Sequence, residues 1–273
     1  MSLLGKLWPA RETLAPHRAH VRIFEDLAYA PHHPKQALDL VLPPAGGPPP
    51  RLAVFVHGGA WKTQDRKFLR GWLGLYTNVG VTLARRGLAT AILSYRQHPI
   101  ATGEASLADL RAALAWLSEH APEYSLDPTP PLLIGHSAGA HLVLTAVVDG
   151  APARGAALIG GMYDLERFVP RLGRREQAAM ATIFGPGPAE LARWSPERHL
   201  SPKTPPLLAA VPAREVPALR AEHDGLVAAA AARGARLTAA TIASVGHMGA
   251  VIRIGAAADP TTALLTDFDA ARP

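Results

Sequence analysis

The stretch PLLIGHSAGA, residues 131–140, places the pattern G-x-S-x-G between two apolar segments. The segment before the pattern, 132–134, predicts a buried strand, and the segment after it, 140–148, predicts a buried helix. A sharp turn from strand to helix with a serine at its centre is the context expected of a nucleophile elbow. The alternative is a connecting loop that is rich in small residues by chance. The flanking strand and helix favour the elbow, with Ser137 as its nucleophile.

A second glycine motif follows another predicted strand. The strand 52–56 is followed by HGGAW, residues 57–61. Acyl transfer requires N–H donors at the point where a carbonyl oxygen becomes negative, and a Gly-Gly turn lets the backbone approach a substrate closely. A helix N-terminus also presents free N–H groups. We therefore expect the amides of Gly58, Gly59 and Ala138 to form an oxyanion hole.

Short apolar runs alternate with longer amphipathic runs along the chain, as is typical of a parallel sheet covered by helices. The central runs are continuously apolar, which indicates that both faces of the sheet are buried. We expect an α/β fold with an eight-stranded, mostly parallel sheet and helices on both faces. The runs predicted as strands are 21–28, 37–42, 52–56, 88–93, 132–134, 156–159, 207–211 and 237–243.

Two of the intervening segments predict helices most clearly. A helix over 107–120 has apolar residues on one face, and Ser106 with Asp109 predicts a capping box at its start. A second helix is predicted from Val216 to about residue 233, where Gly234 ends it.

The chain is expected to form a single domain over 1–273. Residues 166–195 interrupt the alternation with scattered Arg, Gly and Pro, which predicts a small helical insertion or lid. Residues 1–20 are interpreted as an N-terminal extension.

Composition excludes several classes of protein. The 273 residues include no cysteine, so disulfide frameworks, thiolate metal sites and cysteine nucleophiles are excluded. The net charge of +6 comes from Arg and Lys that are scattered along the chain, whereas a nucleic-acid footprint is clustered. No apolar run is long enough to span a membrane, and residues 1–9 lack the apolar core of a signal peptide. We expect a cytoplasmic protein, monomer or homodimer, with no nucleic-acid partner and no stable membrane insertion.

The two glycine motifs, 57–61 and 135–141, together resemble α/β-hydrolases of the hormone-sensitive-lipase and kynurenine-formamidase group. The resemblance extends over about 20–255. It implies a serine esterase that acts on a small-molecule ester and needs no cofactor or metal. Further segments that fit the group are 36–40, 94–96, the helix carrying Asp109, 161–165 and 195–196.

The other members of the site follow from the chain order Ser, acid, His. His247 comes just after the last predicted strand and is expected to be the general base. Glu215 and Asp164 each lie a few residues beyond the end of a strand, whereas Asp224 lies within a predicted helix. The resemblance implies an acid after the penultimate strand, so Glu215 is the preferred acid and Asp164 the alternative.

We therefore expect a carboxylesterase that cleaves esters of small to medium acyl groups through an acyl-enzyme intermediate. One alternative is an arylformamidase that cleaves N-formylkynurenine-type formamides with the same machinery. A second alternative is a non-catalytic binding protein with the hydrolase fold. It is disfavoured because Ser137, His247 and a plausible acid are all present.

Overall fold

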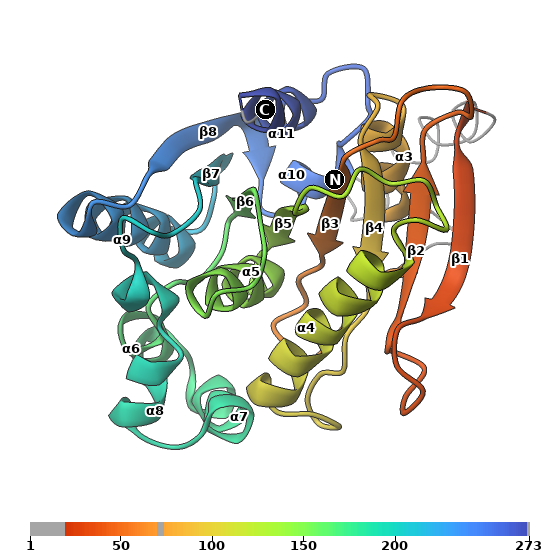
Figure 1. Cartoon of the computed structure of the whole chain (residues 1–273). Coiled ribbons are helices and arrows are strands. Elements are labelled where there is room, and N and C mark those ends of the chain that lie inside the picture. Colours follow the sequence, from red (N-terminus) through yellow and green to blue (C-terminus); the bar gives the residue numbers. More distant parts are fainter. Residues whose placement is uncertain (1–19, 70–73, 272–273) are drawn as a thin grey trace.

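The computed structural model describes residues 20–69 and 74–271, so all but the last residue of the predicted extension 1–20 lies outside the described residues. The strands within these ranges are β1 Arg22–Ala28, β2 Ala37–Leu42, β3 Leu52–Val56, β4 Ala89–Leu93, β5 Leu132–His136, β6 Gly155–Ile159, β7 Leu207–Arg214 and β8 Leu237–Gly246. They form one eight-stranded sheet in the order β1-β2-β4-β3-β5-β6-β7-β8 (Figure 1). Strand β2 pairs antiparallel with β1 and β4, and the other neighbouring pairs are parallel.

The predicted fold class is confirmed, since each of the eight predicted strands is present. The bounds differ most at the carboxyl ends of three strands. Strand β5 continues to His136, β7 to Arg214 and β8 to Gly246. Glu215 therefore follows its strand directly, at the edge of the sheet where the parallel strands end.

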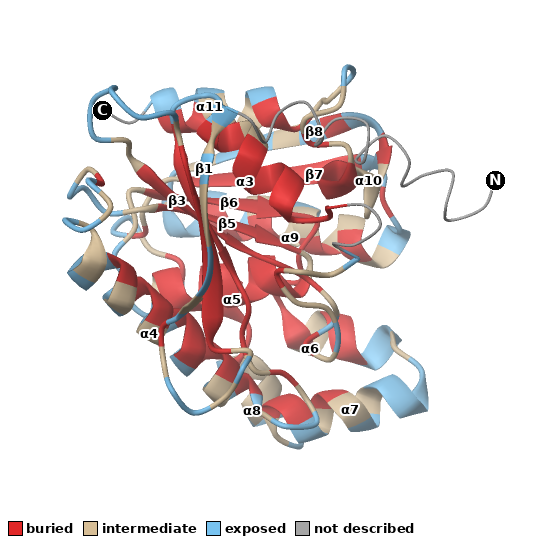
Figure 2. Ribbon diagram, turned by 90° about the vertical axis from the view of Figure 1, so that its right-hand side faces the viewer, coloured by how far each residue is buried: buried red, intermediate tan, exposed pale blue. Residues whose placement is uncertain are grey.

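Helices cover both faces of the sheet. Their bounds are α3 Thr77–Ala84, α4 Gly103–His120, α5 Ala138–Val148, α6 Leu165–Phe168, α7 Arg174–Phe184, α8 Pro188–Arg193, α9 Pro217–Arg233, α10 Gly249–Ile252 and α11 Thr262–Ala270, with short 3₁₀ turns η2 Val169–Arg171 and η3 Pro196–His199. Helices α4, α5 and α9 contribute to one core and α3, α10 and α11 to the other. Figure 2 shows buried strands between α4 and α5 on one side and α3 and α11 on the other. None of the helices in the described ranges has the length and apolarity that crossing a bilayer requires.

Strand β3 shows why a continuously apolar run forms a central strand. Successive side chains of a strand point to opposite faces of the sheet. Val54 and Val56 accordingly pack in the core under α4 and α5, whereas Ala53 and Phe55 pack in the opposite core. Both faces of this strand are covered, so every one of its residues is buried.

The capping box predicted at the start of α4 is wrong. The helix begins at Gly103, and Thr102 is its N-cap, accepting a hydrogen bond from the amide of Ala105. Ser106 instead donates its hydroxyl to the Arg96 carbonyl at 2.7 Å. Asp109 is 1% exposed and pairs with the Arg96 guanidinium at 2.8 Å. Both side chains therefore hold the loop between β4 and α4 rather than the helix N-terminus.

The helix predicted after Glu215 is confirmed as α9. Pro217 occupies its first turn, where the missing N–H costs no hydrogen bond. Gly234 ends it with a left-handed conformation, φ 66°, which glycine adopts without strain.

Helices α6, α7 and α8 lie within the predicted insertion, 166–195, or at its edge. Phe184, at the end of α7, packs edge-on against Trp61, with ring centroids 5.0 Å apart and an interplanar angle of 90°. A Cβ at Gly103 would lie 2.6 Å from the Phe184 ring, so α7 also presses on the start of α4. Trp61 is 1% exposed and serves packing here. The insertion is therefore joined to the loop after β3, and its role as a lid stays a prediction.

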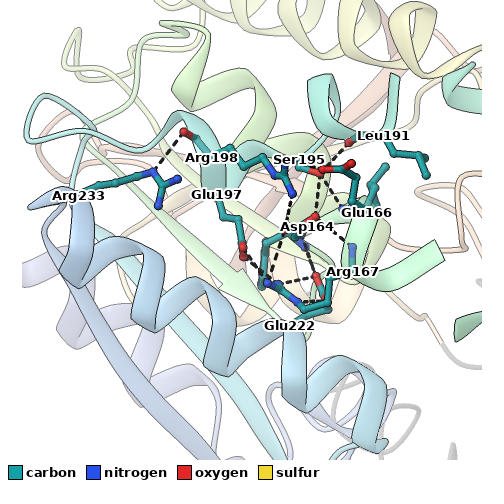
Figure 3. Close-up of polar contacts among 11 residues, drawn as sticks. Asp164, Glu166, Arg167, Leu191, Ser195, Glu197, Arg198, Glu222 and Arg233 are labelled. Carbon is teal, nitrogen blue, oxygen red and sulfur yellow. Dashed lines mark hydrogen bonds and ion pairs between the residues drawn. The ribbon is translucent and has the colours of Figure 1, made fainter. Parts of the chain in front are cut away.

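A group of ionic side chains, here called the Arg167 cluster and made of Arg167, Glu197 and Glu222, joins the insertion to α9 (Figure 3). Arg167 donates Nε to Glu222 at 2.7 Å and Nη1 to Glu197 at 2.8 Å. The Glu222 side chain is fully buried. Its Oε2 also accepts the amides of Tyr163 and Asp164 at 2.9 Å each. Both carboxylate oxygens are thus occupied by donors from the segment that follows β6.

We expect Glu222→Gln to lower the free energy of unfolding by about 1–3 kcal/mol, because the neutral amide weakens a buried contact with Arg167, which keeps Glu197 as its charge partner. The NH₂ group of the glutamine would also face a hydrogen-bond donor, either Arg167 Nε or the amides of Tyr163 and Asp164. Urea unfolding followed by circular dichroism measures the loss. The matched control is Asp224→Asn on the same helix, whose side chain is 68% exposed and whose effect should stay within about 0.5 kcal/mol. Equal stability of the two variants would contradict this account of the Arg167 cluster.

Candidate active site

Ser137 lies at the turn between β5 and α5. Its backbone has φ 55° and ψ −122°, a conformation that is uncommon for a residue with a side chain. Its amide donates to the Ile159 carbonyl at 2.9 Å, which fixes the turn against β6. The side chain makes no capping hydrogen bond to α5. The hydroxyl of a half-buried serine is thus left available at the carboxyl edge of the sheet.

The two glycines of the motif are required by close packing. A Cβ at Gly135 would lie 2.5 Å from the Ala140 Cα. A Cβ at Gly139 would lie 2.1 Å from the Val56 carbonyl oxygen. Both distances are far shorter than any van der Waals contact, so α5 can approach β3 and β5 only where side chains are absent.

The loop after β3 lies directly against Ser137. A Cβ at Gly58 would lie 2.9 Å from the Ser137 Cβ. Gly59 has φ 103° and accepts the amides of Lys62 and Thr63 at 3.0 Å each, which closes a tight turn. No backbone carbonyl within the described ranges accepts the amide of Gly58 or Gly59. The Gly59 amide is thus not used by a backbone carbonyl, whereas the Gly58 amide interacts with the Tyr76 hydroxyl.

Ala138 is the first residue of α5. The first amides of a helix have no carbonyl partner within that helix. The Ala138 amide therefore adds a further donor next to Ser137, and the partial positive charge of the helix N-terminus favours an anion there.

His57 shapes the loop and is kept neutral. It is fully buried, and its ring stacks on Tyr95 at 4.7 Å and on Tyr76 at 5.6 Å. Its Nδ1 lies 2.8 Å from the Gly58 carbonyl, so Nδ1 donates the hydrogen. Tyr95 in turn donates its hydroxyl to the His57 carbonyl at 3.0 Å. Burial lowers the pKa of His57 to about 4.

His247 and Glu215 meet at the ends of β8 and β7. His247 Nδ1 lies 2.8 Å from Glu215 Oε2. A carboxylate accepts, so Nδ1 donates and Nε2 is left to accept a proton. The Glu215 side chain is fully buried, and its Oε1 accepts the Val216 amide at 2.9 Å. A Cβ at Gly160 would lie 2.8 Å from Glu215 Oε2, so a glycine after β6 leaves room for this pair.

Asp164, the alternative acid, lies elsewhere. It is the N-cap of α6 and accepts the Arg167 amide at 3.1 Å. Its carboxylate also contacts Ser195 and Arg198, both at 3.2 Å (Figure 3). Asp164 therefore organises the start of the insertion, and among its contacts within the described residues none is to His247.

Sequence reasoning gave no role in the site to His136, the second residue of the elbow. Its Nε2 lies 3.2 Å from the His247 carbonyl oxygen. The histidine inside G-x-S-x-G was the signal that could have indicated this role. Its partner is 111 residues away in the sequence, so the contact itself could not be predicted. Within 20–69 and 74–271, no three His, Cys, Asp or Glu side chains are grouped to hold a metal ion.

Three buried histidines give a testable pH dependence of stability. Burial lowers the pKa of His57 and of His141 to about 4 and that of His136 well below 6.5. Above about pH 6.5 these rings are neutral in both states, and below it the unfolded chain binds protons that the native protein does not. The free energy of unfolding should therefore fall between about pH 6.5 and 4.5, by up to ~1.4 kcal/mol per pH unit for each ring.

Urea unfolding at a series of pH values measures this slope. The variant His141→Gln should reduce it by about one proton, or ~1.4 kcal/mol per pH unit. A slope that is the same with and without this histidine would contradict the assignment of a neutral buried ring.

Comparison with known proteins identifies several relatives. The chain is 29% identical over 195 residues to a probable isoprenylcysteine alpha-carbonyl methylesterase of Oryza sativa subsp. japonica, covering 64% of this chain and 45% of that protein. It is 27% identical over 240 residues to esterase LipQ of Mycobacterium tuberculosis, covering 80% and 53% respectively. The chain thus spans about half the length of these curated relatives.

A solved structure shares the fold. Esterase B from Lactobacillus rhamnosis superposes with a TM-score of 0.78 at 20% identity, covering 97% of this chain and 95% of that one. At this identity the likeness shows the fold alone.

The BD-FAE family model matches residues 38–205, which is more than half of the chain. The matched segment includes both glycine motifs and ends before β7. The resemblance drawn from these motifs is confirmed, and the chain belongs to the BD-FAE family of α/β-hydrolases.

Proposed function

We propose that this protein is a serine hydrolase that cleaves carboxylic esters of small to medium acyl groups through an acyl-enzyme intermediate. One observation carries the proposal: the buried Glu215 carboxylate is bonded to Nδ1 of His247, at the same sheet edge as the strained Ser137 turn. A nucleophile, an acid and a base in this chain order, on this fold, are the components of a serine-hydrolase triad.

In the proposed reaction, the Ser137 hydroxyl attacks the ester carbonyl carbon while His247 Nε2 accepts the hydroxyl proton. The carbonyl oxygen becomes negative and is stabilised by the amides of Gly58, Gly59 and Ala138. His247 then gives its proton to the leaving alcohol, and the acyl group stays on the serine oxygen. Water, deprotonated by His247, then attacks the acyl carbon; the bond from that carbon to the Ser137 oxygen breaks, His247 returns the proton to this oxygen, and the carboxylic acid is released. Glu215 orients the ring and stabilises its protonated form throughout.

Ester chemistry is supported by the two curated relatives described above, whose names describe a methylesterase and an esterase. Because the chain spans only about half of these proteins, the substrate stays part of the proposal. The expected cytoplasmic location and the monomeric or homodimeric state also remain proposals. A series of p-nitrophenyl esters from acetate to decanoate, assayed beside N-formylkynurenine, tests the substrate class. Preference for the short esters supports the proposal, and preference for the formamide supports the arylformamidase alternative.

The acid is tested by three matched amide substitutions. Glu215→Gln keeps the size of the side chain and removes its charge, so we expect kcat to fall at least about 100-fold with KM nearly unchanged. Asp164→Asn and Asp224→Asn should lose clearly less, because Asp164 caps a helix and Asp224 is exposed. Steady-state kinetics on folded variants provide the measurement. An inactive but folded Asp164→Asn beside an active Glu215→Gln would move the acid to the segment after β6.

A further inference from the structure

His136 lies at the end of β5, directly before Ser137, and is 1% exposed. Two contacts join it to His247. The two rings pack with their centroids 4.6 Å apart at an angle of 38°. Nε2 of His136 also lies 3.2 Å from the His247 carbonyl oxygen. The residue before the nucleophile therefore touches both the ring and the backbone of the expected base.

The hydrogen bond determines where the ring carries its hydrogen. A carbonyl oxygen only accepts, so Nε2 of His136 is the donor. Nδ1 of the same ring is buried and has no partner within the described residues. Burial first, and the nearby His247 second, lower the pKa of His136 well below 6.5. His136 is thus a neutral donor, which adds no positive charge beside His247 when that ring is protonated.

The end of β8 explains why His247 needs such a contact. The pairing of β7 with β8 shifts register between Pro212 and Arg214, and the last pair, Arg214 with Gly246, directly precedes the Glu215 and His247 positions. Regular strand pairing therefore stops before the base. Glu215 holds the imidazole through Nδ1, and the backbone of His247 is held by the His136 hydrogen bond.

We propose that His136 is a positioning residue: its Nε2–H fixes the backbone of His247 and so keeps the imidazole aligned with Ser137 for proton transfer. This inference rests on the proposed function. Glu215 holds the ring of His247, and His136 holds its backbone carbonyl. Together the two hydrogen bonds fix the position and the orientation of the imidazole. Because Ser137 directly follows His136 in the chain, this hydrogen bond connects the backbone of the base to the residue next to the nucleophile. Misalignment of reacting groups by about 1 Å can lower a rate about 100-fold.

Two substitutions separate the donor from the ring. His136→Phe keeps a ring of similar size and removes the N–H, whereas His136→Gln offers an amide N–H near the place of Nε2. His141→Phe is the matched control. That residue is also fully buried, and its Nε2 also donates to a carbonyl, that of Trp194 at 2.9 Å, which belongs to the end of the insertion. Melting temperatures of all three variants establish that they fold.

With p-nitrophenyl butyrate as substrate, we expect His136→Phe to lower kcat at least about 30-fold while KM stays within about threefold. His136→Gln should recover kcat to within about fivefold of the natural protein, and His141→Phe should stay within about threefold. Equal losses in the two Phe variants, or no recovery with Gln, would overturn the positioning role and leave the proposed function standing. A natural protein that hydrolyses no ester would overturn the proposed function itself.

A second measurement is made on the natural protein and uses a folded variant for signal assignment alone. In the natural protein labelled with ¹⁵N-histidine, two-dimensional NMR distinguishes the two neutral tautomers of each ring. His136, assigned by the signal missing from His136→Gln, should remain neutral with its hydrogen on Nε2 from about pH 6.5 to 8. A hydrogen on Nδ1, or a ring that becomes charged in this range, would overturn the proposal whatever the kinetics show.

Discussion

The close approach of α5 to β3 is the constraint on which the site depends. A side chain at Gly139 would lie 2.1 Å from the Val56 carbonyl oxygen, so the helix and the strand meet where only glycine fits. This contact places the start of α5 beside the loop after β3 and brings Gly58 against Ser137. Backbone N–H groups from two segments are thereby gathered next to one serine. Such donors need no reorganisation when a carbonyl oxygen becomes charged, which is the physical basis of an oxyanion hole.

Electrostatics distinguish one histidine from the others around this serine. His57 and His136 are fully or almost fully buried, their pKa values are lowered, and each donates to a backbone carbonyl. His247 is different, because its side chain is 26% exposed and its Nδ1 is bonded to the buried Glu215 carboxylate. A carboxylate partner stabilises a protonated imidazole, whereas a dry environment disfavours it. The neutral rings of His57 and His136 hold backbone carbonyls in place. The His247 ring, which is paired with Glu215, is the one suited to move a proton.

Much of this arrangement could be predicted from sequence because its signals are local. Central strands are apolar at every position since both faces of the sheet are covered, and the residues around Ser137 are small since α5 leaves no room for larger ones. Glu215 could be preferred over Asp164 because the carboxyl ends of parallel strands meet at one edge. The structure places Glu215 on His247 and Asp164 at the start of α6.

What could not be predicted depends on contacts between distant segments. Asp109 has the spacing of a capping residue, but it is buried against Arg96, and nothing within its own helix indicates that partner. The Arg167 cluster joins α6 to Glu222, 55 residues further along the chain. The contact of His136 with the His247 carbonyl is of the same kind. Such polar contacts depend on how helices and strands pack against one another. A single sequence does not show this packing.

The measurement that tests the central claim most directly is covalent labelling of the serine. The protein is incubated with a fluorophosphonate probe, digested, and its peptides are analysed by mass spectrometry. This account predicts one adduct, on Ser137, which disappears in Ser137→Ala and forms at least about 100-fold more slowly in His247→Ala. A folded protein that forms no adduct, or forms it on another residue, would contradict the account.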